Sequence, residues 1–244
     1  MKLVRFLHNG SALKGVLEGD EITAGSTGGS ERYPLGRVKL LAPVEPSKVI
    51  LVGLNYRDHA AELGMSVPEE PVIFIKPSTA VIGPGDTIEY PSSSARVDYE
   101  AELGIVMKKR SRNVPAGKVK DHILGYTCVN DVTARDLQKK DIQWMRAKSF
   151  DTFAPVGPWI ETDLDPRDLS IRSYLNGELK QDSRTSEFIF GIPELVEFIS
   201  GVMTLLPGDV IATGTPPGVG PMDRGDEIVI EVGGIGKLAN RVGA

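Results

Sequence analysis

Three acidic residues stand at spacings that could hold a divalent cation. Glu100 and Glu102 are two apart in the run RVDYEAELGIVM over residues 96–107, and Asp131 follows in VNDVTARD over 129–136. Residues i and i+2 of a strand share a face, where two like charges repel unless a cation lies between them. Carboxylate oxygens suit Mg²⁺, Mn²⁺ or Ca²⁺, and three of them leave coordination positions for water or substrate. We therefore predict an open divalent-metal site, which favours catalysis over a structural role.

Each of these carboxylates also has a plainer interpretation. Glu100 and Glu102 could form the solvated face of an edge strand, where paired charges discourage aggregation. Asp131 could be the N-cap of a helix that begins near Ala134. Against the first alternative, the sequence continues from Leu103 as a buried strand, and a charge pair leading into such a strand needs compensation.

Basic and amide side chains close to the acidic run could complete a site. Arg135 and Gln138 lie three apart in a helical candidate, so they share a face and could clamp a carboxylate beside Asp131. Lys148 could stabilise an oxyanion near a metal. All three could equally be surface residues.

A histidine and a glutamate supply the best candidate for a base. His59 and Glu62 are i, i+3 on a short helical candidate, where the carboxylate can orient the imidazole and raise its basicity. A surface His–Glu pair has the same sequence signature.

The Gly/Pro-rich loop 208–219 contains Thr213 and Thr215 after a strand. It lacks the Gly-Lys-Ser/Thr ending of a P-loop, so nucleotide binding is rejected. No Gly-x-Ser-x-Gly elbow or Cys–His signature indicates a serine or cysteine hydrolase.

Composition limits the partners and the compartment. The chain has 244 residues, 41% of them hydrophobic, and a formal net charge of -5, which argues against a nucleic-acid surface. Cys128 is the single cysteine, which is typical of a reducing compartment and predicts a cytoplasmic protein. We find no signal-peptide pattern and no apolar run of membrane-spanning length, so no membrane partner is expected.

The elements that must position these residues are mostly short strands. Strands are predicted at 3–7, 13–17, 21–23, 48–52, 72–75, 87–90, 97–107, 123–129, 156–160, 171–175, 210–213, 227–232 and 236–242, with a hairpin turn at Asn176–Gly177. Helices are predicted at 55–63, 134–142 and 192–203, and a flexible stretch at Gly25–Ser30. The pattern predicts an α+β fold that is mostly β, a mixed barrel or roll and not a Rossmann sheet. A small N-terminal β-unit over 1–45 would precede a catalytic domain over 46–244.

Together these stretches resemble the fumarylacetoacetate hydrolase family, and closely its acylpyruvate hydrolase, oxaloacetate decarboxylase and homoprotocatechuate-pathway isomerase/decarboxylase members. The resemblance runs from about residue 46 to the end. Its marks are VGLNY with DH at 52–59, FIKP at 74–77, DYEAEL at 98–103, NDVTARDLQ at 130–138, KSFDT at 148–152 and TGTP at 213–216.

The resemblance implies roles for individual residues. Mg²⁺ or Mn²⁺ would bind Glu100, Glu102 and Asp131, with Lys148 beside the metal. The substrate would contact Arg135, Gln138 and a threonine of the loop, Thr213 or Thr215. His59 and Glu62 would form a dyad on a closing segment. The family fold is a mixed β-roll, usually a homodimer, and the match thins at residues 65–70, which leaves the substrate open.

The implied chemistry is cleavage of a 2-oxo acid through a pyruvate enolate stabilised by the metal and Lys148. The dyad favours hydrolysis of an acylpyruvate or fumarylpyruvate, because hydrolysis needs a base to activate water. An oxaloacetate-type decarboxylase and a 2-hydroxyhepta-2,4-diene-1,7-dioate isomerase are alternatives that use the same enolate. A non-catalytic cation-binding protein ranks lower, because Lys148, His59 and Arg135 would then have no role.

Overall fold

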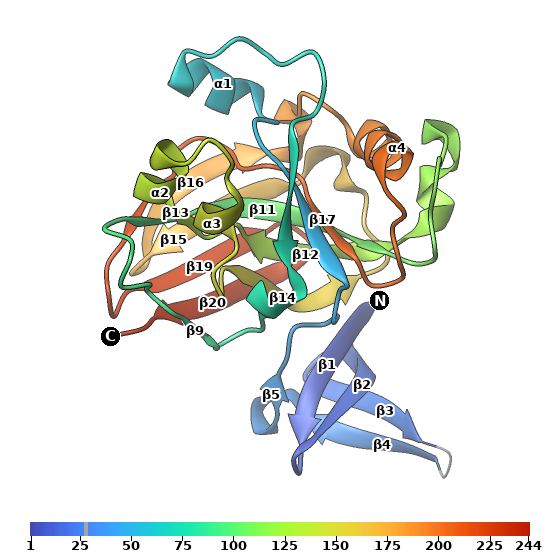
Figure 1. Cartoon of the computed structure of the whole chain (residues 1–244). Coiled ribbons are helices and arrows are strands. Elements are labelled where there is room, and N and C mark those ends of the chain that lie inside the picture. The colour runs from blue at the N-terminus through green and yellow to red at the C-terminus, as the bar shows by residue number, and fades with distance from the viewer. Residues whose placement is uncertain (27–28) are drawn as a thin grey trace.

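The computed structural model describes residues 1–26 and 29–244 and consists mainly of strands (Figure 1). Its largest sheet has 12 strands in the order β4-β3-β2-β1-β14-β12-β11-β17-β6-β7, with β5 beside β1 and β8 beside β14. These strands are β1 (Lys2–His8), β2 (Ser11–Glu18), β3 (Glu21–Ser26), β4 (Gly29–Pro34), β5 (Lys39–Leu40), β6 (Lys48–Val52), β7 (Ile73–Pro77), β8 (Val81–Ile82), β11 (Ala101–Met107), β12 (Ile123–Asn130), β14 (Ala154–Glu161) and β17 (Val210–Ala212).

Two smaller sheets complete the fold. A 5-stranded sheet has the order β16-β15-β19-β20-β9 and a 3-stranded sheet the order β13-β10-β18. Their strands are β9 (Thr87–Ile88), β10 (Val97–Tyr99), β13 (Thr133–Ala134), β15 (Ser170–Leu175), β16 (Glu178–Arg184), β18 (Gly220–Met222), β19 (Glu227–Val232) and β20 (Gly236–Val242). The mostly-β α+β prediction is confirmed. Among the described residues no sheet is ordered as a closed barrel, so the fold is the mixed roll of that prediction.

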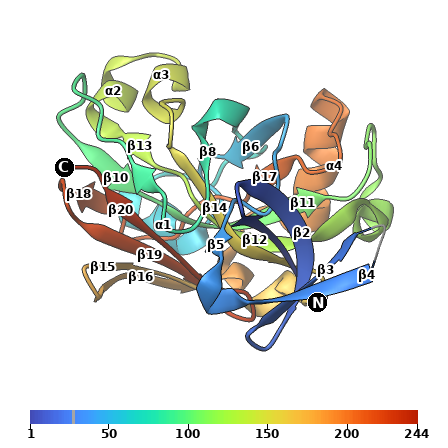
Figure 2. The same ribbon diagram turned by 90° about the horizontal axis from the view of Figure 1, so that it is seen from below.

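The helices are short and lie around the sheets. They are α1 (Arg57–Leu63), α2 (Arg135–Lys140), α3 (Met145–Lys148) and α4 (Ile192–Val202), with 3-10 turns η1 (Leu35–Arg37), η2 (Ser78–Ala80), η3 (Ala116–His122), η4 (Pro166–Asp168) and η5 (Thr185–Glu187). In both views α2 and α3 lie together at one end of the molecule and α4 at the other (Figures 1 and 2). Among the described residues, no helix has the length and apolar content needed to cross a bilayer.

The core lies between the large sheet and the 5-stranded sheet. One cluster of buried side chains joins Leu103 and Ile105 of β11 to Ile171 of β15 and Ile228 of β19. Every residue of β11 is buried, because its other face packs on a second cluster around Val106. A Cβ at Gly104 would lie 2.6 Å from Val129 Cγ2, so this strand approaches β12 too closely for a side chain there.

The N-terminal strands project from one side of the roll and continue its large sheet (Figure 1). The join is the antiparallel pairing of β1 with β14, Lys2 opposite Glu161. At the ends of the stretch predicted to be flexible, Gly25 pairs with Ser30 in the β3–β4 ladder. Residues 27–28 of that stretch lie outside the described residues, and its flexibility stays a prediction. The division near residue 45 stays a prediction.

The predicted strand 97–107 is interrupted at Glu100. β10 pairs with β13 and β18 in one sheet, whereas β11 pairs with β12 and β17 in another. The chain therefore changes sheets at Glu100, whose N–H donates to Asn130 Oδ1 at 3.0 Å in place of a ladder partner.

Candidate active site

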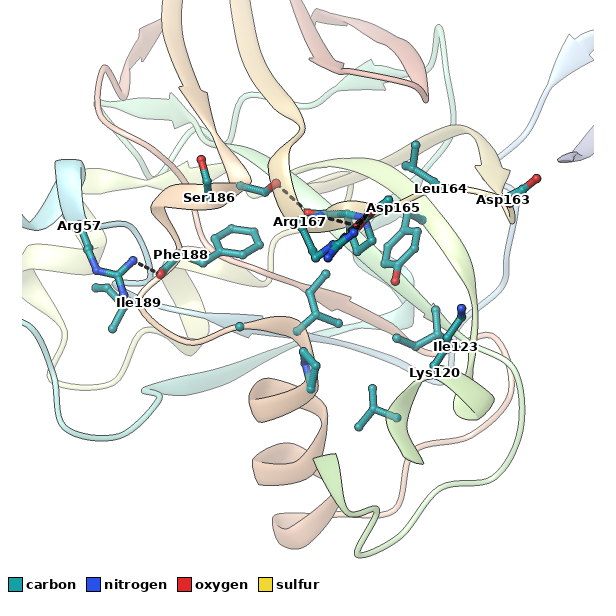
Figure 3. Close-up of a pocket in the computed structure, with 17 residues that line it drawn as sticks. Arg57, Lys120, Ile123, Asp163, Leu164, Asp165, Arg167, Ser186, Phe188 and Ile189 are labelled. Atoms are coloured by element: carbon teal, nitrogen blue, oxygen red, sulfur yellow. Dashed lines mark hydrogen bonds and ion pairs between the residues drawn. The ribbon is translucent and has the colours of Figure 1, made fainter. Parts of the chain in front are cut away.

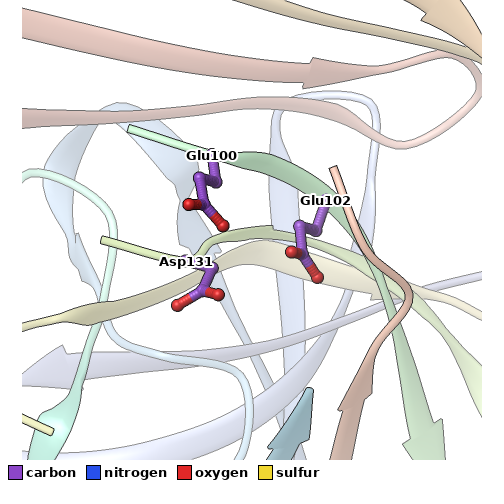
Figure 4. A group of neighbouring side chains, drawn as sticks. All are labelled: Glu100, Glu102 and Asp131. Carbon is purple, nitrogen blue, oxygen red and sulfur yellow. The ribbon is translucent and has the colours of Figure 1, made fainter. Parts of the chain in front are cut away.

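The three predicted carboxylates lie together at this change of sheets (Figure 4). Each of Glu100, Glu102 and Asp131 offers an oxygen within 4.8 Å of the others. Their exposed fractions are 6%, 1% and 1%, respectively, which excludes the solvated edge strand. The N-cap alternative for Asp131 is also excluded, because the N-cap of α2 is Ala134 and has no side-chain cap.

Backbone pairing explains why residues distant in sequence meet here. Ala101 lies opposite Asn130 and Glu102 opposite Val129 in the β11–β12 ladder. Asp131, the residue after β12, donates its N–H to Glu100 O at 2.9 Å. The start of one strand and the end of its neighbour thus bring the acids to one edge.

Two buried cations face the carboxylates. Lys148 Nζ lies 2.6 Å from Asp131 Oδ2 and 3.0 Å from Glu100 Oε2. Lys76 Nζ lies 2.7 Å from Asp131 Oδ1 and also donates to Val132 O and Phe153 O. Sequence reasoning assigned no role to Lys76, because a lysine in a strand normally indicates an exposed position and only tertiary packing buries this one.

Arg135 is fully engaged by neighbouring side chains. Its Nη2 lies 2.5 Å from Glu100 Oε1, its Nε donates to Asp98 Oδ2 at 2.8 Å, and its Nη1 donates to Gln138 Oε1 at 2.6 Å. The predicted shared face of Arg135 and Gln138 is therefore present. The guanidinium acts here as a brace for Glu100, and its role in contacting substrate stays a prediction.

These contacts leave the acids electrostatically unequal. Burial alone would raise the pKa of Glu100, but the Lys148 and Arg135 charges lower it to about 2. Burial raises the pKa of Glu102 well above its ordinary value, and the charges of Asp131 and Glu100 raise it further. Glu102 does accept a hydrogen bond, from Gly214 N at 2.9 Å, but it forms no ion pair with a described residue.

A divalent cation fits this donor set. A buried carboxylate without an ion pair, beside two further carboxylates, is the arrangement that a hard cation between the three would neutralise. The three oxygen donors suit Mg²⁺, Mn²⁺ or Ca²⁺ and leave coordination positions open.

A cavity of about 310 Å³ opens onto Glu100. Its walls combine apolar and polar side chains: Val52, Gly53, Leu54, His59, Leu63, Met65, Phe74, Glu100, Arg135, Gln138, Lys139, Trp144, Lys148 and Thr215. Thr213 is not among them, because it is fully buried and its hydroxyl donates to Leu103 O at 3.0 Å. Of the two predicted loop threonines, only Thr215 lines the cavity.

The predicted dyad is formed on α1. His59 Nδ1 lies 2.8 Å from Glu62 Oε2, and Glu62 Oε1 accepts a hydrogen bond from Gly218 N at 3.1 Å. Because Glu62 occupies Nδ1, the Nε2 atom of His59 is the ring nitrogen left for chemistry. The contact with Gly218 connects α1 to the loop that carries Thr215.

A larger cavity lies elsewhere and has none of the three carboxylates in its lining (Figure 3). Its volume is about 820 Å³, and Ile123, Leu164, Phe188 and Ile189 contribute to its lining. None of the three acids lines it, and Arg57 at its edge donates to Phe188 O. The size of a cavity therefore does not identify the one that adjoins the carboxylates.

Comparisons with known proteins place this site in a family. The model described as fumarylacetoacetate (FAA) hydrolase C-terminal matches residues 48–243. The chain belongs to the fumarylacetoacetate hydrolase family. A second model, described as Rv2993c-like, N-terminal, matches residues 1–43. The resemblance predicted from the sequence motifs is thus confirmed.

Relatives within this family carry more than one activity. A mitochondrial oxaloacetate tautomerase of Bos taurus is 43% identical, over 86% of this chain and 71% of its own. The structure of a 5-carboxymethyl-2-hydroxymuconate delta-isomerase from Mycobacterium smegmatis is 50% identical, with a TM-score of 0.93 over 100% of this chain and 98% of that one. A maleylpyruvate hydrolase from Sphingobium, solved with manganese(II) and pyruvate, is 32% identical, with a TM-score of 0.84 over 100% of both chains.

Proposed function

We propose that this protein catalyses proton transfer at carbon 3 of a 2-oxo acid, interconverting keto and enol or shifting a double bond. The observation that carries the proposal is the position of one oriented base, His59, on the same cavity as Glu100 and Lys148. Tautomerase and isomerase relatives at 43% and 50% identity support the same class of reaction. The oxaloacetate and hydroxyheptadienedioate alternatives of the sequence analysis belong to this substrate class.

In this proposal one side chain acts as the base and another supplies a positive charge. His59 Nε2 would accept the proton from carbon 3 and, directly or through water, deliver a proton to the 2-oxo oxygen, which gives the enol, or to another carbon, which shifts the double bond, while Glu62 holds the imidazole in one tautomer. The Lys148 ammonium, which sits between two carboxylates, would offset the negative charge that develops on the 2-oxo oxygen. A divalent ion held by Glu100, Glu102 and Asp131 would supply Lewis-acid polarisation of the bound 2-oxo acid.

Hydrolysis of an acylpyruvate is the second candidate. The dyad could activate water in place of removing a carbon-bound proton, and the maleylpyruvate hydrolase with 32% identity supports that use. Both reactions share the enolate and the same side chains, so they differ only in what the base deprotonates.

The deciding experiment measures proton exchange and bond cleavage in parallel. Oxaloacetate, a monocarboxylic 2-oxo acid and an acylpyruvate are each incubated in D₂O with Mg²⁺-loaded protein or with Mg²⁺ alone. NMR follows deuterium entering carbon 3, and a coupled assay follows pyruvate release. We expect protein-dependent exchange that exceeds any release of pyruvate. Fast pyruvate release from the acylpyruvate would instead select the hydrolase. If the protein produced neither deuterium exchange nor pyruvate release, the proposal would be refuted.

The base is tested by comparing two histidines. His59→Asn should slow carbon 3 exchange by roughly 10²–10⁴-fold, the usual contribution of a positioned base. His8→Asn is the matched control, because His8 lies on β1 in the N-terminal unit and should exchange at the parent rate. Parent activity in the His59 variant would remove that residue from the mechanism.

A further inference from the structure

The metal-binding strand is held in part by a side chain from the opposite sheet. Gln181 lies on β16, the end strand of the 5-stranded sheet, and is fully buried. Its Oε1 accepts a hydrogen bond from Ala101 N at 3.0 Å. Ala101 is the single residue between Glu100 and Glu102, so this amide reaches the peptide that joins two of the three carboxylates.

The same amide also holds the loop on the other side of the site. Gln181 Nε2 donates to Thr215 Oγ1 at 2.9 Å and to Pro216 O at 2.8 Å. The orientation of the amide is fixed, because Ala101 N can only donate and Pro216 O can only accept. Both ends of the side chain are therefore satisfied in a site that water does not reach.

Thr215 closes the network from the loop side. Its hydroxyl donates to Ala101 O at 2.9 Å, so the N–H and the C=O of Ala101 are both bonded by side chains. In the same loop, Gly214 N donates to Glu102 Oε2. Ala101 begins β11 just after the chain changes sheets. Gln181 and Thr215 therefore supply the backbone hydrogen bonds of Ala101 that a neighbouring strand would otherwise supply.

We propose that Gln181 is a positioning residue for the metal site, setting the separation of Glu100 and Glu102 and the approach of the Thr215 loop. The amide acts through the backbone of Ala101 and through Thr215, without touching the ion or the substrate. Outer partners that orient metal ligands typically change metal affinity by about 10–100-fold when removed. Because Gln181 lies on the 5-stranded sheet and Ala101 on the large sheet, the metal affinity of the site would depend on how the two sheets pack.

The test measures Mn²⁺ affinity, which is independent of any reaction. Gln181→Met keeps the length and approximate volume of the side chain but removes all three hydrogen bonds. Titration calorimetry with Mn²⁺ alone, far below the unfolding temperature, should show a Kd raised about 10-fold or more. Asn240→Leu is the matched control. Asn240 is another buried amide, on β20, and its Nδ2 donates to Gly83 O and Asp86 O. Its loss should lower the stability of the fold and leave the Kd for Mn²⁺ at the parent value.

A double-mutant cycle with Thr215→Val separates positioning from general loss of packing. Because Gln181 and Thr215 bond to each other and both hold the backbone of Ala101, the two substitutions should be less than additive in their effect on Mn²⁺ affinity. Gln181→Asn, which keeps a shorter amide, should bind Mn²⁺ more tightly than Gln181→Met and serves in its place if that variant does not fold. Parent affinity in the Gln181 variants, or an equal loss in Asn240→Leu, would overturn the proposal. Loss of Mn²⁺ affinity would support it even if no 2-oxo acid were turned over.

Discussion

Lys139 and Lys140 are adjacent on α2, yet only Lys139 lines the cavity that opens onto Glu100. Among the described residues Lys139 makes no ion pair, whereas Arg135 and Lys148 in the same cavity are each held by carboxylates. The same cavity is also lined by the apolar side chains of Phe74 and Trp144. A cation without a carboxylate partner in this lining suits a second carboxylate of the substrate.

Lys139→Gln should therefore raise the KM for a 2-oxo dicarboxylate such as oxaloacetate by roughly 2–5-fold, the effect of one exposed ion pair. The KM for a monocarboxylic 2-oxo acid should not change, and Lys140→Gln should leave both values at the parent level. Steady-state kinetics on the two substrates with the three proteins measure this difference. An equal rise in KM for both substrates would show that Lys139 does not bind the second carboxylate.

At the residue scale, the sequence predicted side chains whose chemistry is visible in local spacing. Glu100, Glu102 and the His59–Glu62 pair are such cases, because i, i+2 and i, i+3 neighbours share a face. Lys76 and Gln181 could not be assigned in this way, since their partners lie on elements distant in sequence. A lysine or glutamine in a strand predicts exposure until the packing of the sheets is known.

At the scale of elements, one aspartate clamps the parallel β6–β17 pair. Asp209, fully buried before β17, accepts hydrogen bonds through Oδ1 from Ser47 N and Ser47 Oγ at 3.0 and 2.6 Å. Its Oδ2 lies 2.5 Å from Lys48 Nζ and accepts from Leu206 N at 2.8 Å. The carboxylate thus ties the start of β6 to the turn that enters β17.

Asp209→Asn should lower the free energy of unfolding at pH 7 by about 1–3 kcal/mol, since charged hydrogen bonds are lost in a buried place. Burial raises the pKa of Asp209, but hydrogen bonds from Lys48 and Ser47 outweigh it, so the folded-state pKa lies below the ordinary value. A lowered carboxyl pKa stabilises the fold above the unfolded-state pKa, and that contribution is lost as pH falls through the folded-state value. The difference between parent and variant should therefore shrink below about pH 4.

Urea unfolding curves at pH 7 and at several lower pH values check this expectation. Asp182→Asn is the control, because Asp182 forms an exposed pair with Arg172 and its removal should cost less than about 0.5 kcal/mol. A difference that is constant with pH would assign the loss to packing and not to charge.

Most strands were predictable because their apolar residues alternate or run continuously between turn residues. The break at Glu100 was not, since the run 97–107 reads as one strand. It arises from the exchange of partners, β13 and β18 before the break and β12 and β17 after it, and no local signal in the sequence specifies which strands are neighbours.

At the scale of the whole molecule, metal binding should be linked to stability. A ligand at 100 times its Kd stabilises the folded state by about 2.7 kcal/mol, which for a chain of this size corresponds to a Tm increase of about 5–10 °C. Differential scanning calorimetry with Mn²⁺, Mg²⁺ or Ca²⁺ would measure this and rank the ions. Glu102→Gln should abolish the increase, and an increase that survives in that variant would locate the ion elsewhere.

The partners of the whole molecule stay predictions from the sequence. They are a small 2-oxo acid substrate, a second copy of the chain, and neither nucleic acid nor membrane. Sedimentation velocity measures whether a homodimer forms.

The order of strands has a consequence for how the chain is made. β9 is the end strand of the 5-stranded sheet, and its partner is β20, with Thr87 opposite Arg241. β6 likewise pairs with β17, Ile50 opposite Ile211. During synthesis, strands from the first half of the chain must therefore wait for strands near its end, and pairings between distant segments form slowly. Apolar strands of the first half, such as β6, keep one edge unpaired until the later strands have been made, and unpaired edges of apolar strands are prone to aggregation during that interval.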